Sequence, residues 1–440
     1  MFGNQKESSV VVNPVNRLVG EMRVPGDKSI SHRAAMMASL ARGASVVKNF
    51  SSARDCAATL GCLQVLGVRV VRDNSIVRIG DDESAGILRA PAQVLDAENS
   101  GTTMRLLAGV LAGQPFAATM TGDESLRSRP MSRVAEPLRL MGATIELSEE
   151  GRAPLRVEGR RPLRAVRYRP SVASAQIKSA VLLAGLFADG VTIVEEPTRT
   201  RDHTERLLKE FGAQVAQNGN EISVTGGAQL RARELMVPGD VSSAAFFAAA
   251  AAVLPGSDLL IRDVGLNPTR AAFLQTLARL GADVSFSDER VLGGEPVGTI
   301  RVRGRDLKDA HSLTVSGTVI PNLIDELPLL AFAAAALGCE MELRDAAELR
   351  VKESDRIRAT VENLSRMGAR IEERADGWRL RGGGTRLRGA SLHAFGDHRI
   401  AMSCAVAALA AAGESRIEGA QAAVQVSLPE FWKLLEDVSQ

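Results

Sequence analysis

The side chains most able to do chemistry in this sequence lie in short polar segments that follow turns and precede apolar stretches. The first segment, Val24–Arg33, has the sequence VPGDKSISHR and places Lys28, His32 and Arg33 close together. A Pro-Gly turn followed by Asp and Ser is typical of a helix start. Because backbone N–H groups and the helix macrodipole favour anions there, the segment predicts a site for a phosphate or carboxylate group.

Two further segments contain residues suited to binding anions. Asn99–Arg105 (NSGTTMR) begins with small residues, and Gly101 lets a ligand approach the backbone closely. Ser125–Pro130 (SLRSRP) places Arg127 and Arg129 in a predicted loop. Because a guanidinium group can hold a carboxylate or phosphate with two hydrogen bonds, we assign that role to Arg129 and a surface ion pair to Arg127.

Carboxylates accompany cations in the last third of the chain. In Leu349–Ile357, a helix would place Lys352 and Arg356 on one face, with Glu353 beside Lys352. A surface helix with salt bridges and a proton-transfer site both fit this pattern. Asp325 precedes an all-apolar stretch, so it is expected either to cap a helix or to act as a general base.

Polar residues recur at the predicted helix starts. Capping and solvation explain any one of them, but their repetition favours a ligand with more than one negative group. The residues are Lys28, Ser29, Arg33, Asn99, Gly101, Thr102, Arg105, Ser174, Gln176, Lys178, Lys352, Arg356, Asp397, His398 and Arg399.

The elements that position these residues form a repeat. Helical patterns end at a glycine, which enters the left-handed region without a Cβ penalty, at Gly67, Gly142, Gly212, Gly281 and Gly368. Helix starts are predicted at Ser29, Ser100, Ser174, Ser242, Asp325 and Asp397. Strands are predicted at Ala44–Phe50, Gly190–Glu195, Ser257–Asp263 and Glu340–Arg344. The sequence therefore predicts about six copies of one α/β unit, ordered as βαβαβ.

Six units divide into two domains of three. A second copy of the first turn, Val237–Ser242 (VPGDVS), has Val241 where the first copy has a lysine, so one half of the molecule is expected to have lost the charge that the other holds. With boundaries at the two turns, residues 23–236 form a continuous domain, and residues 1–22 and 237–440 form a discontinuous one. The two crossings predict a hinge.

Composition excludes several classes of protein. The formal charge is only +2 and aromatic residues make up 3%, which argues against a nucleic-acid partner. The apolar run Ala244–Leu254 is shorter than the roughly 20 residues of a membrane span, and Met1–Val12 lacks an apolar signal region. We expect a cytoplasmic protein with no membrane partner.

Cofactor motifs are not found in the sequence. The cysteines, Cys56, Cys62, Cys339 and Cys404, are not at metal-ligand spacing and are expected to be buried thiols. No P-loop, Rossmann glycine motif, zinc-protease motif or serine-nucleophile motif is present. An enzyme that acts on anions without a cofactor or metal is the remaining class.

Together the motifs resemble the 5-enolpyruvylshikimate-3-phosphate synthase family, in the same order over nearly the whole chain. They are Val24–Arg33, Asn99–Arg105, Arg129–Pro130, Ser174–Gln176, Arg201–His203, Asp325, Lys352–Arg356 and Asp397–Arg399. The resemblance implies an α/β fold, a two-domain inside-out barrel with three βαβαββ repeats per domain and the active site in the cleft between the domains. It also implies a monomer that transfers the enolpyruvyl group of phosphoenolpyruvate to the 5-hydroxyl of shikimate 3-phosphate.

The resemblance also implies roles for individual residues. Asp325 would be the base for the attacking hydroxyl, and Glu353 with Lys28 would handle the methylene proton. Shikimate 3-phosphate would contact Lys28, Ser29, Arg33, Ser174, Ala175, Gln176, Arg201, Asp325 and Lys352. Phosphoenolpyruvate would contact Lys28, Asn99, Gly101, Arg129, Gln176, Arg356 and Arg399.

Three positions depart from many family members: Leu106, Ala175 and Val426 stand where others have Pro, Ser and Lys. The first two suit the subgroup less sensitive to glyphosate, whereas Gly101 keeps room for its phosphonate. Three other functions stay open. In a UDP-N-acetylglucosamine enolpyruvyl transferase the acid is usually a Cys on a mobile loop of the first domain, and no Cys lies near Ser125–Pro130 here. Balanced charge and few aromatic residues argue against an RNA-end phosphate cyclase. A non-enzymatic scaffold would not need Asp325 and Glu353 among cations.

Overall fold

The chain forms two compact units in the computed structural model, which describes residues 9–83, 86–305, 311–383 and 386–440. The continuous unit comprises Gly26–Pro238 and Val291–Glu295. The discontinuous unit comprises Met1–Pro25, Gly239–Arg290 and Pro296–Gln440. The expectation that there is no signal region rests on Met1–Val12, and residues 1–8 of that segment lie outside the described residues.

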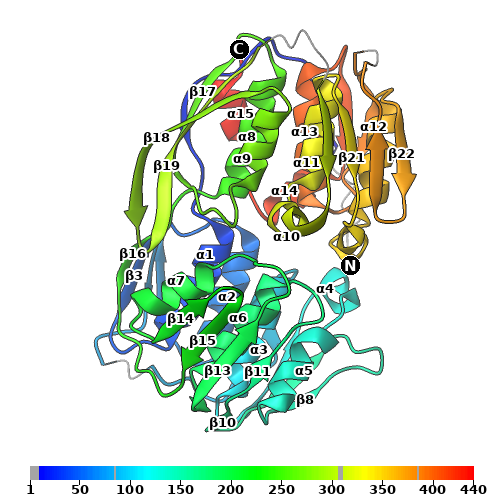
Figure 1. Ribbon diagram of the computed structural model, residues 1–440. Helices are drawn as coiled ribbons and strands as arrows, with labels where there is room; N and C mark the ends of the chain where they lie inside the picture. The colour runs from blue at the N-terminus through cyan, green and yellow to red at the C-terminus, as the bar shows by residue number, and fades with distance from the viewer. Residues whose placement is uncertain (1–8, 84–85, 306–310, 384–385) are drawn as a thin grey trace, which may run out of the picture. The chain divides into compact units, whose positions relative to one another are not determined.

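The continuous unit repeats one sheet pattern (Figure 1). Its strands are β3 (Ser45–Lys48), β4 (Val70–Asp73), β5 (Ile76–Ile79), β6 (Leu95–Asp96), β7 (Ala117–Thr121), β8 (Thr144–Glu146), β9 (Leu155–Glu158), β10 (Leu163–Arg164), β11 (Arg167–Tyr168), β12 (Ala188–Asp189), β13 (Val191–Glu195), β14 (Val215–Asn218), β15 (Glu221–Thr225) and β16 (Glu234–Met236). Its helices are α1 (Lys28–Ser39), α2 (Arg54–Val65), α3 (Gly101–Ala112), α4 (Glu124–Ser128), α5 (Ser132–Leu140), α6 (Ala175–Gly185) and α7 (His203–Glu210). Within the described residues the sheets have the orders β16-β3-β5-β4, β6-β7-β9-β8 and β11-β13-β15-β14, with a ribbon of β10 and β12.

The discontinuous unit follows the same plan. Its strands are β1 (Val10–Val12), β2 (Val19–Arg23), β17 (Asp258–Gly265), β18 (Asp283–Leu292), β19 (Glu295–Arg303), β20 (Ser312–Val315), β21 (Glu340–Leu343), β22 (Ile371–Arg374), β23 (Gly377–Leu380), β24 (Ser391–His393) and β25 (Ser415–Glu418). Its helices are α8 (Val241–Val253), α9 (Ala272–Arg279), α10 (Ile320–Leu323), α11 (Leu327–Ala336), α12 (Arg356–Arg366), α13 (His398–Ala410), α14 (Ala420–Gln425) and α15 (Phe431–Val438), with 3-10 helices η1 (Gly317–Val319) and η2 (Ala347–Val351). Its described sheets have the orders β18-β19-β17-β2, β20-β21-β23-β22 and β1-β25-β24.

Most repeats join two parallel strands through a helix and add an antiparallel hairpin. In β6-α3-β7-α5-β8-β9, for example, β6 is parallel to β7, and β9 is antiparallel to both β7 and β8. Among the described residues, the repeat of β24, α13 and β25 has no such hairpin, and β1 is the antiparallel partner of β25. Two repeats take their first strand from a distant part of the chain. β2 precedes α1 but pairs with β17, with Val19 opposite Asp258. β16 precedes α8 but pairs with β3, with Glu234 opposite Val46.

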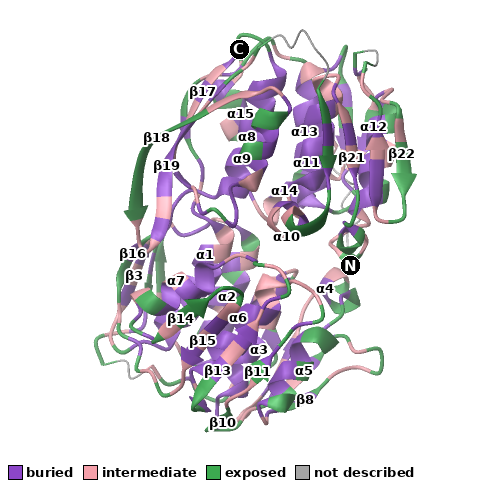
Figure 2. Ribbon diagram, in the orientation of Figure 1, coloured by how far each residue is buried: buried purple, intermediate pink, exposed green. Residues whose placement is uncertain are grey.

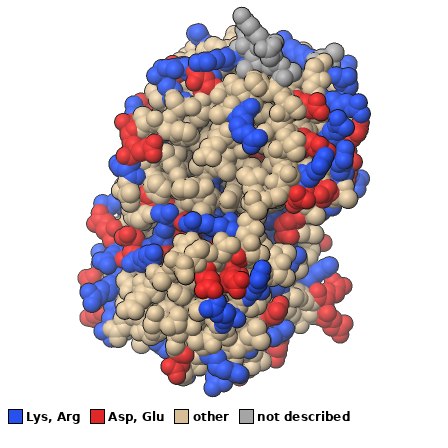
Figure 3. Space-filling model, viewed as in Figure 1, with Lys and Arg blue, Asp and Glu red and all other residues tan. Residues whose placement is uncertain are grey.

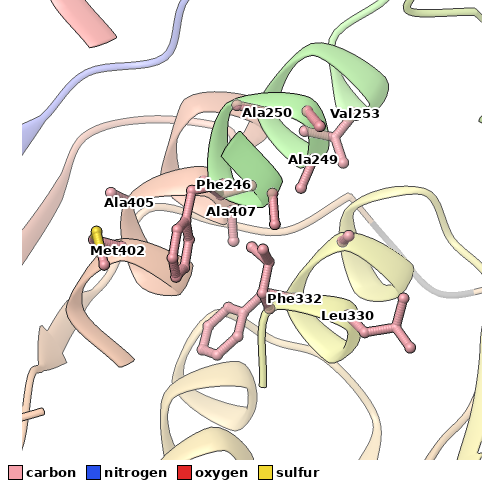
Figure 4. Packing of buried hydrophobic residues seen from close by; sticks show 14 of the residues in the cluster. Phe246, Ala249, Ala250, Val253, Leu330, Phe332, Met402, Ala405 and Ala407 are labelled. Atoms are coloured by element: carbon pink, nitrogen blue, oxygen red, sulfur yellow. The ribbon is translucent and has the colours of Figure 1, made fainter. Parts of the chain in front are cut away.

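Helices occupy the interior of each unit. α1, α3 and α6 pack together in the continuous unit, and α8, α11 and α13 pack together in the discontinuous unit. Nearly all of their residues are buried, as Figure 2 shows. In Figure 4, Phe246, Phe332 and Met402 lie in one cluster contributed by α8, α11 and α13. Helices that are apolar on every face require this environment, and the predicted fold class is confirmed.

The predicted helix ends are confirmed more often than the predicted starts. Each of the five glycines has a positive φ directly after a helix, the predicted strands hold within two residues at each end, and Ser100, Ser174 and Asp397 cap their helices. The starts at Ser29 and Ser242 were wrong. Asp27 and Asp240 are the caps, because their carboxylates accept from Ile30 N and Ser242 N at 2.9 and 2.7 Å.

The start predicted at Asp325 was also wrong by one residue, since α11 begins after Glu326. All four cysteines are buried free thiols, as predicted.

Across the described residues no single helix is long and apolar enough to cross a membrane; Gly317–Leu323 and Leu327–Ala336 pass that test only as a pair bent by 97°. In the view of Figure 3, basic side chains are interspersed with acidic ones.

We expect Gly109→Ala to lower the free energy of unfolding by about 1–3 kcal/mol. A Cβ at Gly109 in α3 would overlap the backbone of Ala180 in α6, where neither helix can yield without moving its neighbours. Gly61→Ala in α2 is the matched control, because nothing lies within 4 Å of its Cβ; it should raise stability by roughly 0.5–1 kcal/mol. Urea unfolding measures both, and stabilisation by both variants would contradict the close packing.

Candidate functional site

Each unit gathers polar side chains where its central helices begin. We call the set in the continuous unit the basic cluster: Lys28, Ser29, Arg33, Asn99, Gly101, Arg105, Arg129, Ser174, Ala175, Gln176 and Arg201. We call the set in the discontinuous unit the mixed-charge cluster: Asp325, Glu326, Lys352, Glu353, Arg356, Asp397 and Arg399. Nearly all of these residues were singled out from the sequence.

Arg33 joins three helices in the basic cluster. Its guanidinium group donates to Thr204 Oγ1 in α7 at 2.7 Å, to Ser179 Oγ in α6 at 2.8 Å and to the Ser29 carbonyl in α1 at 2.9 Å. The side chain is buried. These three hydrogen bonds fix the orientation of the guanidinium group beside Ser29 and the start of α6.

Two more arginines meet at the start of α3. Arg105 donates to Gln176 Oε1 at 3.0 Å. Arg129 is buried and donates to Asn99 Oδ1 at 2.9 Å. A Cβ at Gly101 would lie 2.7 Å from Arg105 Nη1 and 3.5 Å from Arg129 Nη1. Gly101 therefore leaves room for both guanidinium groups.

Lys28 begins α1 and lies 2.9 Å from the carboxylate of Asp55, the second residue of α2. At the start of α6, Ser174 accepts from Ile177 N at 3.4 Å, and Ala175 is the first helical residue. Arg201 is half-buried just before α7. Asp55 was missed by the sequence analysis, although its place in the first turn of a helix was a usable signal.

Three residues considered with the basic cluster do not belong to it. Arg127 is exposed on α4, which replaces the predicted loop. His32 is buried and its Nδ1 lies 2.6 Å from Thr59 Oγ1. Burial, with the charges of Lys28 and Arg33, lowers the pKa of His32 well below its ordinary value, so the ring is neutral.

Lys178 is the third of these residues, and it is a structural cation. Only 1% of its side chain is exposed, and its ammonium lies 3.0 Å from Glu196 and 2.7 Å from Glu205. Glu196 also accepts from Thr200 N at 3.1 Å. Lys178 therefore fixes the segment that leads to Arg201. Burial raises the pKa of Glu205, although the charge of Lys178 lowers it.

Arg356 is the centre of the mixed-charge cluster. Its guanidinium group lies 2.8 Å from Asp397, 2.6 Å from Glu353 and 3.3 Å from Asp325, and only 1% of the side chain is exposed. Burial opposes the charge, but Asp397, Glu353 and Asp325 together raise the pKa of Arg356 above its ordinary value. One cation therefore orients three carboxylates.

Arg399 completes this cluster. Its Nη1 donates to the Asp325 carbonyl at 3.0 Å and to Glu326 Oε1 at 3.1 Å, and its Nη2 lies 3.7 Å from the Asp325 carboxylate. Ser242 Oγ also donates to Glu326, and Arg270 donates to Ser242. The charge expected to be lost near Val241 is thus supplied by Arg270, Glu326 and Arg399, residues distant in sequence.

The predicted helix through Lys352 and Arg356 was wrong. Asp355 caps α12 by accepting from Arg358 N at 3.0 Å, so Lys352 lies outside the helix. Burial lowers the pKa of the Lys352 ammonium, and the charge of Asp325 opposes this shift. In the described part of the chain, no group of three His, Cys, Asp or Glu side chains is placed to hold a metal ion.

Comparison with known proteins agrees with this arrangement. Residues 12–435 match the family described as EPSP synthase (3-phosphoshikimate 1-carboxyvinyltransferase). The chain belongs to the EPSP synthase family. A 3-phosphoshikimate 1-carboxyvinyltransferase of Desulforudis audaxviator is 52% identical over 96% of this chain and 97% of its own length. One of Gloeobacter violaceus is 51% identical over 98% of both chains.

Solved structures give the same result. A structure of EPSP synthase from Acinetobacter baumannii is 42% identical, covers 98% of each chain and superposes with a TM-score of 0.87. The resemblance to the EPSP synthase family, the fold class and the class of enzyme are confirmed. The UDP-sugar transferase and the RNA-end cyclase are less favoured, because the curated relatives and the solved structures above are EPSP synthases.

We expect Lys178→Met to lower the free energy of unfolding by about 3–5 kcal/mol, because it leaves Glu196 and Glu205 buried without their cation. The control is the triple variant Lys178→Met, Glu196→Gln, Glu205→Gln, which removes all three charges and should recover most of the loss. Equilibrium urea unfolding measures both. A loss below about 1 kcal/mol for the single variant would show that the pair is not desolvated.

Proposed function

We propose that this chain transfers the enolpyruvyl group of phosphoenolpyruvate to the 5-hydroxyl of shikimate 3-phosphate and releases phosphate, with residues of both clusters contacting the substrates. The observation that carries this proposal is the placement of arginines and carboxylates at the starts of the buried central helices in a chain of the EPSP synthase family. Both substrates are small polyanions, which such helix starts favour.

The basic cluster would bind the phosphate and carboxylate groups. Lys28, Ser29, Arg33, Ser174, Ala175, Gln176 and Arg201 are proposed to contact shikimate 3-phosphate, and Lys28, Asn99, Gly101, Arg129 and Gln176 to contact phosphoenolpyruvate. Arg33 is held by three hydrogen bonds and Arg129 by Asn99. Because their orientations are fixed before the ligand arrives, binding orders few additional side chains.

The mixed-charge cluster would perform the proton transfers. Asp325 is 18% exposed and is proposed to accept the hydroxyl proton as the oxygen attacks C2 of phosphoenolpyruvate. Glu353, 24% exposed, is proposed to deliver a proton to the methylene carbon, with Lys28, and to remove one during elimination. Arg356 and Arg399 would stabilise the phosphate as it leaves, and Lys352 would contact shikimate 3-phosphate.

The remaining expectations belong to the same proposal: a cytoplasmic monomer that uses no cofactor and has no nucleic-acid or membrane partner. Ala175 and Val426, which depart from many family members, lie at the start of α6 and the end of α14. Neither side chain can donate a hydrogen bond, so neighbouring donors would hold the substrates at these positions.

A coupled phosphate assay tests the function. We expect phosphate release only when shikimate 3-phosphate and phosphoenolpyruvate are both present, because each substrate alone lacks the partner that completes the addition. Phosphate release with UDP-N-acetylglucosamine in place of shikimate 3-phosphate would overturn the proposal in favour of the UDP-sugar transferase.

Asp325→Asn tests the role of the base. We expect kcat to fall by about 10²–10⁴-fold, because an amide cannot accept the hydroxyl proton, while calorimetry shows shikimate 3-phosphate binding within a few-fold of the unmodified enzyme. Glu362→Gln, which removes a carboxylate paired with Arg366 on α12, is the control and should retain full activity. Loss of binding in Asp325→Asn would make Asp325 a binding or structural residue instead.

A further inference from the structure

The three central helices of the discontinuous unit begin beside arginine–carboxylate pairs. At α8 the pair is Asp240 with Arg270 at 3.8 Å, at α11 it is Glu326 with Arg399 at 3.1 Å, and at α13 it is Asp397 with Arg356 at 2.8 Å. Asp240 and Asp397 also cap their own helices. A carboxylate that caps a helix has a local reason to be there.

Glu326 has no such reason. It precedes α11 in a helical backbone conformation, φ −104° and ψ −2°, and its side chain does not cap the helix. Only 3% of the side chain is exposed. Its Oε1 instead accepts from Ser242 Oγ in α8 at 2.5 Å and from Arg399 Nη1 in α13 at 3.1 Å. One buried carboxylate from the α11 end therefore holds residues of the two other central helices.

The bond to Arg399 determines where that guanidinium group points. Nη1 is shared between Glu326 Oε1 and the Asp325 carbonyl, and Nη2 stays 3.7 Å from the Asp325 carboxylate. Charge-assisted hydrogen bonds of this kind are about twice as strong as neutral ones. Without Glu326, the nearest anionic partner of Arg399 would be Asp325 itself, and a close pair would draw the guanidinium group toward the proposed base.

We propose that Glu326 is a positioning residue that holds Arg399 in the orientation required to bind the phosphoenolpyruvate phosphate or carboxylate and keeps it from pairing closely with Asp325. The proposal rests on the proposed function, in which Arg399 contacts phosphoenolpyruvate. Glu326 touches neither substrate in this account. It acts through Arg399 alone, while its bond to Ser242 contributes to helix packing.

The test compares Glu326→Ala, Glu326→Gln and Ser242→Ala in steady-state assays with each substrate varied in turn. Glu326→Ala should raise KM for phosphoenolpyruvate about 10–100-fold and leave KM for shikimate 3-phosphate within about threefold, because only Arg399 loses its partner. Glu326→Gln keeps an acceptor at the same atom and should recover at least half of that loss on a logarithmic scale. Ser242→Ala removes the bond to Glu326 and the acceptor of Arg270 but leaves the bond between Glu326 and Arg399, so it should lower the melting temperature without changing either KM.

Equal rises in both KM values for Glu326→Ala, or the same kinetic change in Ser242→Ala, would overturn the proposal and make Glu326 a packing residue. If Glu326→Ala does not fold, Glu326→Gln with Ser242→Ala decides by the same comparison. A crystal structure of the Glu326 variant gives a readout independent of activity: Arg399 should have left the Asp325 carbonyl and approached its carboxylate. That result would stand even if the unmodified enzyme failed the assay with shikimate 3-phosphate, and an unmoved Arg399 would refute the positioning role.

Discussion

The packing of three buried central helices inside each unit is the constraint on which both clusters depend. A helix buried on every face has little room for charged side chains, so most of them lie near its ends, and Lys178 within α6 is buried together with Glu196 and Glu205. At the starts of these helices, unpaired N–H groups and the macrodipole favour anions. Close contacts such as Gly109 against Ala180 set the spacing of the helices, and the spacing in turn fixes how near residues such as Arg105 and Gln176 lie.

The two clusters differ in how their positive charges are matched by carboxylates. In the basic cluster, Lys28 has Asp55 as a neighbour, Arg33 donates to the hydroxyls of Thr204 and Ser179, and Arg129 donates to the amide oxygen of Asn99. In the mixed-charge cluster, Arg356 and Arg399 are matched by carboxylates. In the proposed function, this arrangement of carboxylates beside cations suits proton transfer.

Local chemistry made much of the fold predictable from the sequence. The glycine stops depend only on the left-handed conformation that follows a helix, so Gly67 and its counterparts could be found by pattern. The basic and carboxylate residues could be found as motifs, but their partners could not. The contacts of Glu326, Arg270 and Asp55 are with segments distant in sequence. Lys178 lies in a motif that looks like a ligand site, but its side chain is buried in an ion pair of the core. Only the tertiary structure distinguishes these cases.

The pairing of the first two strands with strands much later in the chain has a consequence for synthesis. β1 and β2 are made first, yet their partners in the sheets come much later: Val19 pairs with Asp258 and Val10 with Ile417. Strands β3 to β16 of the continuous unit are made before β17 exists, and only Val291–Glu295 of that unit come later. During elongation on a ribosome the continuous unit can therefore fold as an insertion while two early strands keep unpaired edges, and chaperones would be needed most in that interval.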